Sequence, residues 1–395
     1  MTLFRPNTET ELVAIVQQAL ATDEPLELVA GGSKRGLGRP LQMPHTLDLG
    51  AFAGIASYEP EELVLTAGAA TPLAEIETAL AAANQMLAFE PGDWRALLGS
   101  VKAVPTLGGT LACNLAGPRR IRQGAARDHF LGLKGVSARG EAFKAGSKMV
   151  KNVTGYDLCK LMAGSYGTLA ALTEVSVKVL PRPEATRTIV LYGLDDVAAL
   201  KAMTRALNSS HELGGAAHLP RAVSGAGKAM TLTRVEGPAP SVEARAAALR
   251  AELTDIGAAE ILGDEESLAL WPRLRDMTPL VEPRDAVIWR VSLAPNAAPA
   301  LLARLKDQLD FKYFLDWGGG LLWLAVTGAK NGGAAMIRSA AGIGHATMIR
   351  GSDAVRVAVP VFQPQAPAVA ALSLRVKESF DPKRLFNRGR MYRDV

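Results

Sequence analysis

The sequence predicts an α+β protein of two domains followed by a C-terminal segment, and three observations favour this class. Stretches with helical and strand-like periodicity are mixed along all 395 residues. The chain is long enough for two or three separate cores. Pro181-Arg182-Pro183 resists any regular element and indicates a boundary. We therefore expect domains over 1–183 and 184–350 and a terminal segment over 351–395.

The first domain is expected to begin with a helix from Thr8 to Leu20. Thr8 and Glu11 form a capping-box pattern, and the apolar residues between them and Leu20 share one face. A second helix is expected from Pro72 to about Ala83, with Thr71 as its cap. The expected strands of this domain lie near 26–30, 46–49, 54–58, 63–67, 129–137 and 171–180.

The second domain shows alternating helix and strand patterns without an internal repeat. Its expected helices lie at about 196–207, 242–253, 267–277 and 297–309. Its expected strands lie near 187–192, 229–235, 286–293 and 320–326. Ala, Gly and Ser are enriched around 208–228 and 329–344, which predicts mobile loops there. The tail over 366–395 returns to helix before it ends.

Composition excludes several classes of protein. A net charge of +5 suits a phosphate-rich cofactor or an anionic acid but is too small to indicate nucleic acid binding. The two cysteines, Cys113 and Cys159, cannot hold an iron–sulfur cluster or a structural zinc, and they indicate a reducing, cytoplasmic compartment. We see no signal peptide and no run of about 20 apolar residues, so any membrane association is expected to occur through a partner.

Gly31 to Gly38 (GGSKRGLG) directly follows the first strand of the first domain. Amide groups of such a turn can converge on an anion such as a pyrophosphate, and Lys34 and Arg35 add positive charge at its rim. The turn is neither a G-x-G-x-x-G unit nor a P-loop. Taken alone, it is explained more simply as a plain glycine-rich turn.

Two further glycine clusters change this interpretation. The second is PTLGGTLACNLAG, from Pro105 to Gly117, and the third runs from Gly164 to Leu169 into a strand around Val175. The third belongs to the stretch GSKMVKNVTGYDLCKLMAGSYGTLAALTEVSVKVLPRP over 146–183. In this order and spacing the three loops resemble the vanillyl-alcohol-oxidase-type flavoproteins, in the version seen in D-2-hydroxyacid dehydrogenases and in the E-type subunits of glycolate oxidases. The resemblance covers about 25–183 and the last fifteen residues.

The resemblance implies a two-subdomain FAD-binding domain of the p-cresol methylhydroxylase (PCMH) type, an α+β cap domain and a tail that returns to the FAD domain. It also implies a non-covalently bound FAD. In the tail, the segment from Asp381 to Asn387 is similar to the family's terminal segment, whose Asn meets the flavin, although Arg388 stands where a proline is usual. The expected cofactor-binding residues are Gly31, Gly32, Ser33, Lys34, Arg35, Gly36, Leu37, Thr106, Leu107, Gly108, Gly109, Ala112, Gly164, Gly167, Thr168, Leu169, Val175 and Asn387.

The positions of the histidines do not identify a catalytic residue. Oxidation of a 2-hydroxy acid on a flavin needs a cation for the carboxylate and a base for the hydroxyl proton. The family's His-rich motif is absent from the five histidines of this chain, and no Asp or Glu lies at metal-ligand spacing to any of them, so we expect no bound metal. His345, in a small-residue turn, is the best single candidate for a base, and a loop histidine bonded to backbone is the alternative. His211 and His218 are expected at the surface, and Lys151 and Tyr156 are expected to make packing and helix-start contacts.

Arg119 and Arg120 belong to the densest basic patch, Pro118-Arg119-Arg120-Ile121-Arg122. Three interpretations stay open for this patch. Arginine offers bidentate donors, so the patch can clamp a carboxylate or phosphate. It can also be a docking face for a partner subunit, or a solvated loop with Arg127 and Asp128 as a local ion pair.

The resemblance implies an FAD-binding subunit of a glycolate oxidase or dehydrogenase complex, which oxidises glycolate to glyoxylate and passes electrons to an iron–sulfur partner. The implied partners are a larger FAD-binding D-type subunit and an iron–sulfur F-type subunit. One alternative is a self-sufficient FAD-dependent dehydrogenase of another small 2-hydroxy acid, and another is a non-catalytic scaffold. A cell-wall reductase of the same fold is disfavoured because it lacks the KNVTGYDL and GPRR motifs. We expect a cytoplasmic location, with any contact to the inner membrane made through partners.

Overall fold

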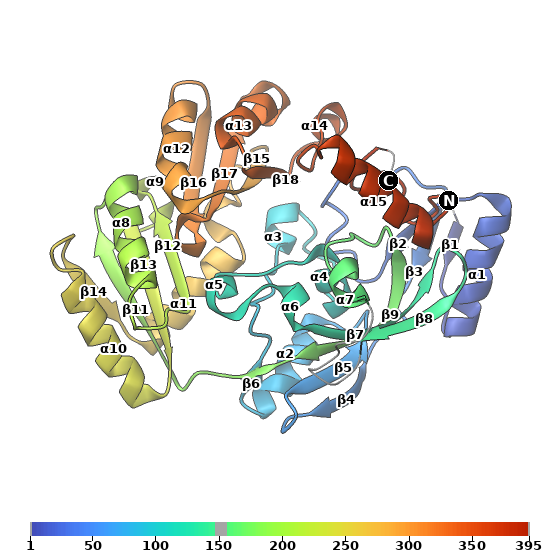
Figure 1. The fold of residues 1–395 in the computed structure, drawn as a ribbon, viewed down its shortest axis with the longest axis horizontal. Coiled ribbons are helices and arrows are strands. Elements are labelled where there is room, and N and C mark those ends of the chain that lie inside the picture. Colours follow the sequence, from blue (N-terminus) through green and yellow to red (C-terminus); the bar gives the residue numbers. More distant parts are fainter. Residues whose placement is uncertain (1, 147–155, 394–395) are drawn as a thin grey trace.

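The computed structural model describes residues 2–146 and 156–393. Most of the KNVTGYDL motif, including Lys151, lies outside the described residues. Two lobes lie side by side, and the two chain ends lie close together. We call residues 184–350, at the left of Figure 1, the cap domain, and residues 2–146 and 156–183, at the right, the FAD domain after the expected cofactor. The mixed helix and strand content confirms the predicted α+β class.

The first subdomain is a small parallel sheet covered by one long helix. Its strands follow the order β1-β3-β2. The bounds are β1 (Thr2–Phe4), α1 (Glu9–Thr22), β2 (Leu26–Val29) and β3 (His45–Asp48). Helix α1 begins after Thr8, whose hydroxyl accepts a 3.2 Å hydrogen bond from the Glu11 amide. Its apolar face packs against Leu26, Leu47 and the tail residue Phe386. The predicted helix is therefore present, and it closes a core that includes the end of the chain.

The second subdomain is a five-stranded antiparallel sheet in the order β4-β5-β9-β7-β8. Its strands are β4 (Ile55–Glu59), β5 (Val64–Gly68), β7 (Phe130–Ser137), β8 (Ala142–Gly146) and β9 (Ala170–Lys178). Its helices are α2 (Leu73–Ala82), α3 (Arg95–Leu98), α4 (Leu107–Cys113), α5 (Arg120–Gln123), α6 (Ala126–His129) and α7 (Leu158–Met162). Thr71 does not cap α2: its hydroxyl donates to the Gly68 carbonyl at 2.7 Å, so α2 begins after Pro72.

The chain leaves this subdomain through a short ribbon, in which β10 (Leu180–Pro181) pairs with β6 (Gln85–Met86). The next strand already belongs to another sheet, of eight antiparallel strands in the order β14-β11-β13-β12-β16-β17-β15-β18. These strands are β11 (Ala185–Tyr192), β12 (Gly215–Leu219), β13 (Met230–Gly237), β14 (Ala259–Leu262), β15 (Val287–Ser292), β16 (Asp310–Asp316), β17 (Leu321–Thr327) and β18 (His345–Arg350).

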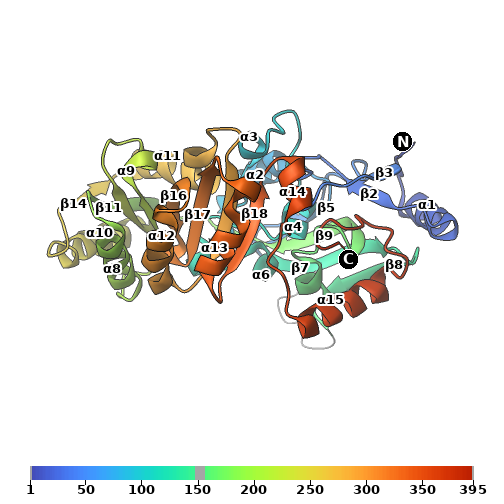
Figure 2. The ribbon, with the colours of Figure 1, turned by 90° about the horizontal axis from the view of Figure 1, so that it is seen from above.

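Alternate residues of the eight-stranded sheet face two different layers. Ile189 and Leu191 pack under the helices α8 and α10, whereas Val190 belongs to the cluster that contains Trp94 of the FAD domain. One face is thus covered by the cap's own helices and the other includes the contact with the FAD domain (Figure 2). The helices of this lobe are α8 (Asp196–Leu207), α9 (Arg221–Ser224), α10 (Ala239–Glu252), α11 (Asp264–Arg275), α12 (Ala298–Lys306) and α13 (Ala334–Ala341).

The two predicted mobile loops contain regular structure, so that prediction was wrong. Strand β12 lies inside 208–228, is fully buried and pairs with β13 and β16. Its small residues are needed for packing, because a Cβ at Gly215 would lie 3.0 Å from the Trp271 ring. Helix α13 occupies 334–341 of the second stretch. The surface prediction for His211 and His218 was also wrong: both are buried, and His218 Nδ1 is hydrogen-bonded to the Thr231 hydroxyl at 2.9 Å.

The tail crosses back from the cap to the FAD domain through α14 (Asp353–Ala358) and α15 (Pro367–Phe380). Phe386 then pairs with Leu26 in a parallel bridge beside β2. The fully buried Lys377 ammonium donates to Asp381 Oδ2 at 2.7 Å and to the Thr168 carbonyl at 2.6 Å. Because a buried ammonium needs such partners, this contact attaches α15 to the third glycine-rich loop. The predicted return of the tail is confirmed.

Candidate cofactor site

A cavity with about 740 Å³ of empty space lies where the three glycine-rich loops and the tail meet. Loops that are distant in sequence therefore contribute to one hollow. The predicted residues that line it are Gly31, Gly32, Ser33, Lys34, Arg35, Thr106, Gly108, Gly109, Ala112, Gly167 and Asn387.

Seven of the predicted residues do not line the cavity: Gly36, Leu37, Leu107, Gly164, Thr168, Leu169 and Val175. Leu107 and Val175 are fully buried in the core beneath the five-stranded sheet, together with Leu169. Leu37 packs in the interdomain cluster with Trp94. These side chains hold the loops in place from behind, a distinction that the loop sequences alone do not contain.

The sequence analysis missed half of the cavity wall. Most of the missed residues are apolar and come from strand ends or helix turns, where they look like ordinary core positions in the sequence. Arg390 is the exception, because a charged residue three positions after Asn387 was a signal that it could reach the same hollow. The missed residues are Leu28, Val29, Ala30, Leu49, Ala69, Ala70, Cys113, Tyr166, Ala170, Leu172 and Arg390.

Glycine is required in these loops because backbone segments cross at close range. A Cβ at Gly31 would lie 1.9 Å from the Val104 carbonyl oxygen, and one at Gly108 would lie 2.7 Å from the Ala69 backbone oxygen. Gly167 has φ of +70°, a conformation that glycine adopts without strain. The sequence analysis expected bare backbone to approach a ligand. In the structure, Gly31 and Gly108 allow the loops to approach one another.

Asn387 joins three segments of the chain at the cavity. Its Oδ1 accepts a 2.9 Å hydrogen bond from the Leu28 amide at the end of β2. Its Nδ2 donates to the Tyr166 carbonyl at 2.9 Å and to the Gly167 carbonyl at 3.2 Å. Both N–H donors and the oxygen of the buried amide are thus bonded to protein groups. Its structural role is to hold the first and third loops at a set separation.

Two cations face this cavity without a carboxylate partner. In the described part of the chain, neither Lys34 nor Arg390 has a carboxylate within ion-pair distance; Lys34 Nζ donates to the Ser33 hydroxyl and Arg390 Nη2 to the Lys34 carbonyl. Burial lowers the pKa of both groups. Arg35 differs, because it pairs with the buried Glu27. Buried charge is costly unless it is paired. The cavity therefore favours an anionic ligand.

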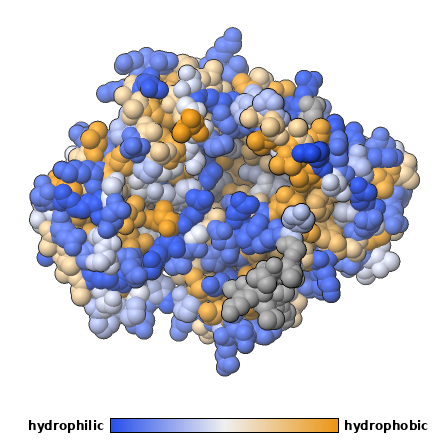
Figure 3. Space-filling view, in the orientation of Figure 1, coloured by the Kyte–Doolittle hydropathy of each residue, from blue (hydrophilic) through white to orange (hydrophobic). Residues whose placement is uncertain are grey.

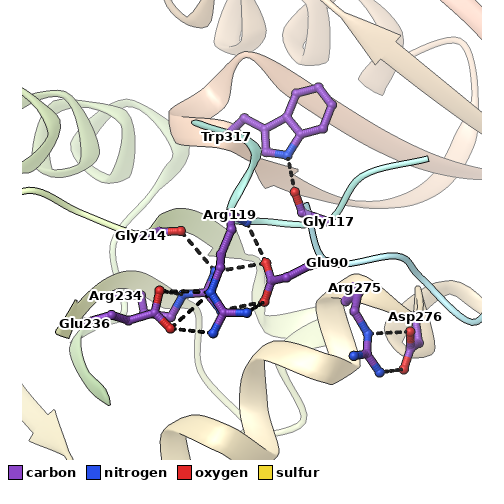
Figure 4. A network of polar contacts seen from close by, with 9 residues as sticks. All are labelled: Glu90, Gly117, Arg119, Gly214, Arg234, Glu236, Arg275, Asp276 and Trp317. Carbon is purple, nitrogen blue, oxygen red and sulfur yellow. Dashed lines mark hydrogen bonds and ion pairs between the residues drawn. The ribbon is translucent and has the colours of Figure 1, made fainter. Parts of the chain in front are cut away.

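Arg119 and Arg120 of the basic patch have different surroundings in the structure. Arg119 is held in a buried network that joins the domains, with Glu90 at 2.9 Å and Glu236 at 2.6 Å (Figure 4). Arg234 completes the network by donating to both oxygens of Glu90. Arg119 is thus already paired on both sides and is not available as a clamp for a substrate. Arg120 is exposed and lies apart from the network.

His345 is not brought to the cavity. It is exposed at the start of β18, the edge strand of the cap sheet, where it pairs with Ser292. Among the residues in 2–146 and 156–393, no group of three or more His, Cys, Asp or Glu is arranged to hold a metal ion. The structure therefore gives no support to His345 as a flavin-facing base.

The residues that line the cavity show whether FAD would fit there. Lys34 and Arg390 would hold its diphosphate, and the apolar strand ends that line the same cavity would contact its rings. The fold and the cavity define the class: an FAD-binding oxidoreductase of the two-domain flavoprotein type.

Comparison with known proteins identifies the family. The FAD binding domain family matches residues 2–146. The chain is 35% identical over 388 residues to the glycolate oxidase subunit GlcE of Escherichia coli K12, and the match covers 97% of each chain. The chain therefore belongs to the GlcE family of flavin oxidoreductase subunits, which confirms the predicted resemblance and the predicted cofactor.

Other relatives agree over shorter lengths. Glycolate oxidase subunit GlcD of Bacillus subtilis is 42% identical over 97 residues, which is 24% of this chain and 21% of that protein. The structure of p-cresol methylhydroxylase covers 99% of this chain and 88% of that chain with a TM-score of 0.75 at 14% identity. This likeness confirms the predicted PCMH-type fold.

The described helices do not include a segment that is long and apolar enough to cross a bilayer. On the face shown in Figure 3, hydrophobic side chains lie in small patches among hydrophilic ones.

Proposed function

We propose that this chain is the FAD-carrying E-type subunit of a glycolate oxidase complex that oxidises glycolate to glyoxylate. The observation that carries the proposal is the meeting of three glycine-rich loops and Asn387 around one cavity with two unpaired cations, in a chain that matches GlcE over nearly its whole length. In the proposed complex, electrons pass through the flavin to an iron–sulfur F-type subunit, next to a larger D-type flavoprotein. We propose a cytoplasmic location, with contact to the inner membrane only through these partners.

The residues of the chain have separate roles in this proposal. FAD, when bound, supplies the acceptor for the two electrons of the alcohol. Lys34 and Arg390 neutralise its diphosphate, and Asn387 keeps the loops apart by the distance the cofactor needs. The apolar strand ends exclude water from the cavity. The lining residues in the described part of the chain include no histidine, so the proton of the hydroxyl must be taken by another group.

Reconstitution of the purified full chain with FAD tests the cofactor part of the proposal. We expect one flavin per chain, and we expect Lys34→Met to weaken FAD binding by at least about 10-fold, because a charge-assisted hydrogen bond is lost. Lys102→Met is the matched control, since Lys102 is exposed and does not line the cavity. A chain that retains no flavin would contradict the proposal.

Co-purification tests the complex. A tagged chain expressed with its D-type and F-type partners should yield a complex that contains flavin and iron and reduces a dye in the presence of glycolate. A stable chain that carries FAD but never associates with these partners would favour the self-sufficient dehydrogenase instead.

A further inference from the structure

An aromatic ring at the domain interface lies within cation–π distance of two guanidinium groups. Trp317 follows β16 of the cap, and its indole N–H donates to the Gly117 carbonyl of the FAD domain at 3.2 Å. The guanidinium carbon of Arg120 lies 4.3 Å from the ring centroid of Trp317, and that of Arg290 lies 5.1 Å from it. Because both distances end on the same centroid, the two guanidinium carbons are at most their sum, about 9 Å, apart.

Among the described residues, neither guanidinium group forms an ion pair, and the carboxyl group within electrostatic range of Arg290, that of Asp316, is buried with its pKa raised to about 7. In the described parts of the chain, no carboxylate lies within 4 Å of the Arg120 or Arg290 nitrogens, and neither side chain donates a hydrogen bond. Arg290 is only partly exposed, and burial together with the charge of Arg120 lowers its pKa to about 10, against the opposing effect of Tyr166 and Asp316. The neighbouring Arg119 shows the contrast, since it has Glu90 and Glu236. Two cations that repel each other, of which one is largely buried, form a costly arrangement unless an anion joins them.

This pair of arginines is connected to the cofactor cavity through Tyr166. Tyr166 lines the cavity and also packs against the apolar cluster that contains Trp317. Its phenol lies within electrostatic range of both Arg290 and Arg390. Arg290 itself is on β15, on the sheet face opposite Trp289 and Val291, which pack under the cap helices. It therefore points from the cap toward the FAD domain.

We propose that Arg120 and Arg290, both placed against Trp317, bind the carboxylate of a small 2-hydroxy acid beside the Tyr166 end of the cofactor cavity. One carboxylate has two oxygens, and each can accept hydrogen bonds of about 2.7–2.9 Å from a different guanidinium. Cation–π contact with the Trp317 ring helps to hold each guanidinium in place. This inference rests on the proposed function, because it assigns the acid-binding residues of the same oxidation, and it places them on this chain.

Titration of the full chain reconstituted with FAD tests this assignment. Glycolate is added and its binding is measured by calorimetry, with the flavin absorbance spectrum as a second readout. We expect saturable binding that Arg120→Met and Arg290→Met each weaken by about 10- to 100-fold, while FAD binding is unchanged. The matched control is Arg122→Met, which removes the same charge from the same short helix but breaks only an exposed pair with Glu212.

Several outcomes would overturn the assignment. Equal glycolate affinity in the parent chain and in both variants would do so, and so would no glycolate binding by an FAD-loaded parent chain. Inorganic phosphate that binds as tightly as glycolate would show a general anion site and not a carboxylate site. If Arg290→Met fails to fold, Arg290→Lys keeps the charge and loses the bidentate donor, and it should still weaken binding. Failure of the parent chain to hold FAD would instead contradict the proposed function.

Discussion

Replacing Glu90 by Gln should destabilise the contact between the two domains. The Glu90 carboxylate is buried in the FAD domain and accepts hydrogen bonds from the Arg119 amide at 2.6 Å and from Arg234 at 2.9 and 3.0 Å. Arg234 belongs to β13 of the cap, so this carboxylate connects the two lobes. Glutamine keeps the shape of the side chain but removes its charge, which leaves two buried guanidinium groups with Glu236 as their remaining anion.

The expected cost follows from the partners that remain. Removing one member of a buried ion pair costs about 3–5 kcal/mol, and we expect the lower end, about 3 kcal/mol, because Glu236 still pairs with Arg119. Burial opposes the ionisation of Glu90, but Arg234 and Arg119 outweigh burial and lower its pKa. A lowered pKa contributes stability that is present above the pKa of the unfolded chain and is lost in acid. The difference between wild type and Glu90→Gln should therefore shrink as pH falls below 4.5, the ordinary value.

Urea unfolding followed by tryptophan fluorescence measures this effect, since Trp94 and Trp317 both lie at the domain contact. We expect Glu90→Gln to lower the midpoint and to separate the unfolding of the two lobes. Glu212→Gln is the matched control: Glu212 has the same φ of 50° as Glu90, but its pair with Arg122 is exposed and should contribute less than about 1 kcal/mol. If both variants unfold at the same urea concentration, the reasoning from burial is wrong.

Three further results are expected. Asn387→Asp keeps the acceptor for Leu28 but loses both donated hydrogen bonds, so FAD affinity should fall at least about 10-fold in a fluorescence titration; an unchanged affinity would contradict this role. Lys377→Met leaves Asp381 buried without its partner and should cost about 3–5 kcal/mol by chemical denaturation, whereas a neutral result would show that α15 is not held by this pair. Burial raises the pKa of Asp316 to about 7. Between about pH 4 and pH 7 the Asp316 carboxyl group therefore stays protonated in the native protein but ionises in the unfolded chain. Stability should therefore fall by up to about 4 kcal/mol as pH rises from about 4 to 7, and Asp316→Asn should abolish this dependence.

Short sequence patterns were enough to predict the fold and the cofactor loops. Glycine at positions such as 31 and 167 reflects a close backbone crossing and a positive φ, and both requirements act over a few residues. Apolar periodicity likewise located α1 and α8 to within about two residues. The same reasoning failed for β12, because a run of Gly and Ala looks like a loop until Trp271 is packed against it.

The partners of the charged groups followed from tertiary structure alone. Arg119 and Arg120 are adjacent and chemically identical in the sequence, yet Arg119 pairs with Glu236, 117 residues away, and Arg120 lies against Trp317 without an anion. The lining role of Arg390 also depends on the path of the tail across β2. The sequence by itself determined the fold class and the order of the glycine-rich loops, because backbone requirements are local, and the resemblance of these loops to a known family implied the cofactor. Only the docking of the two domains decided which cations are neutralised, because ion pairing depends on distances between segments that the chain order does not set.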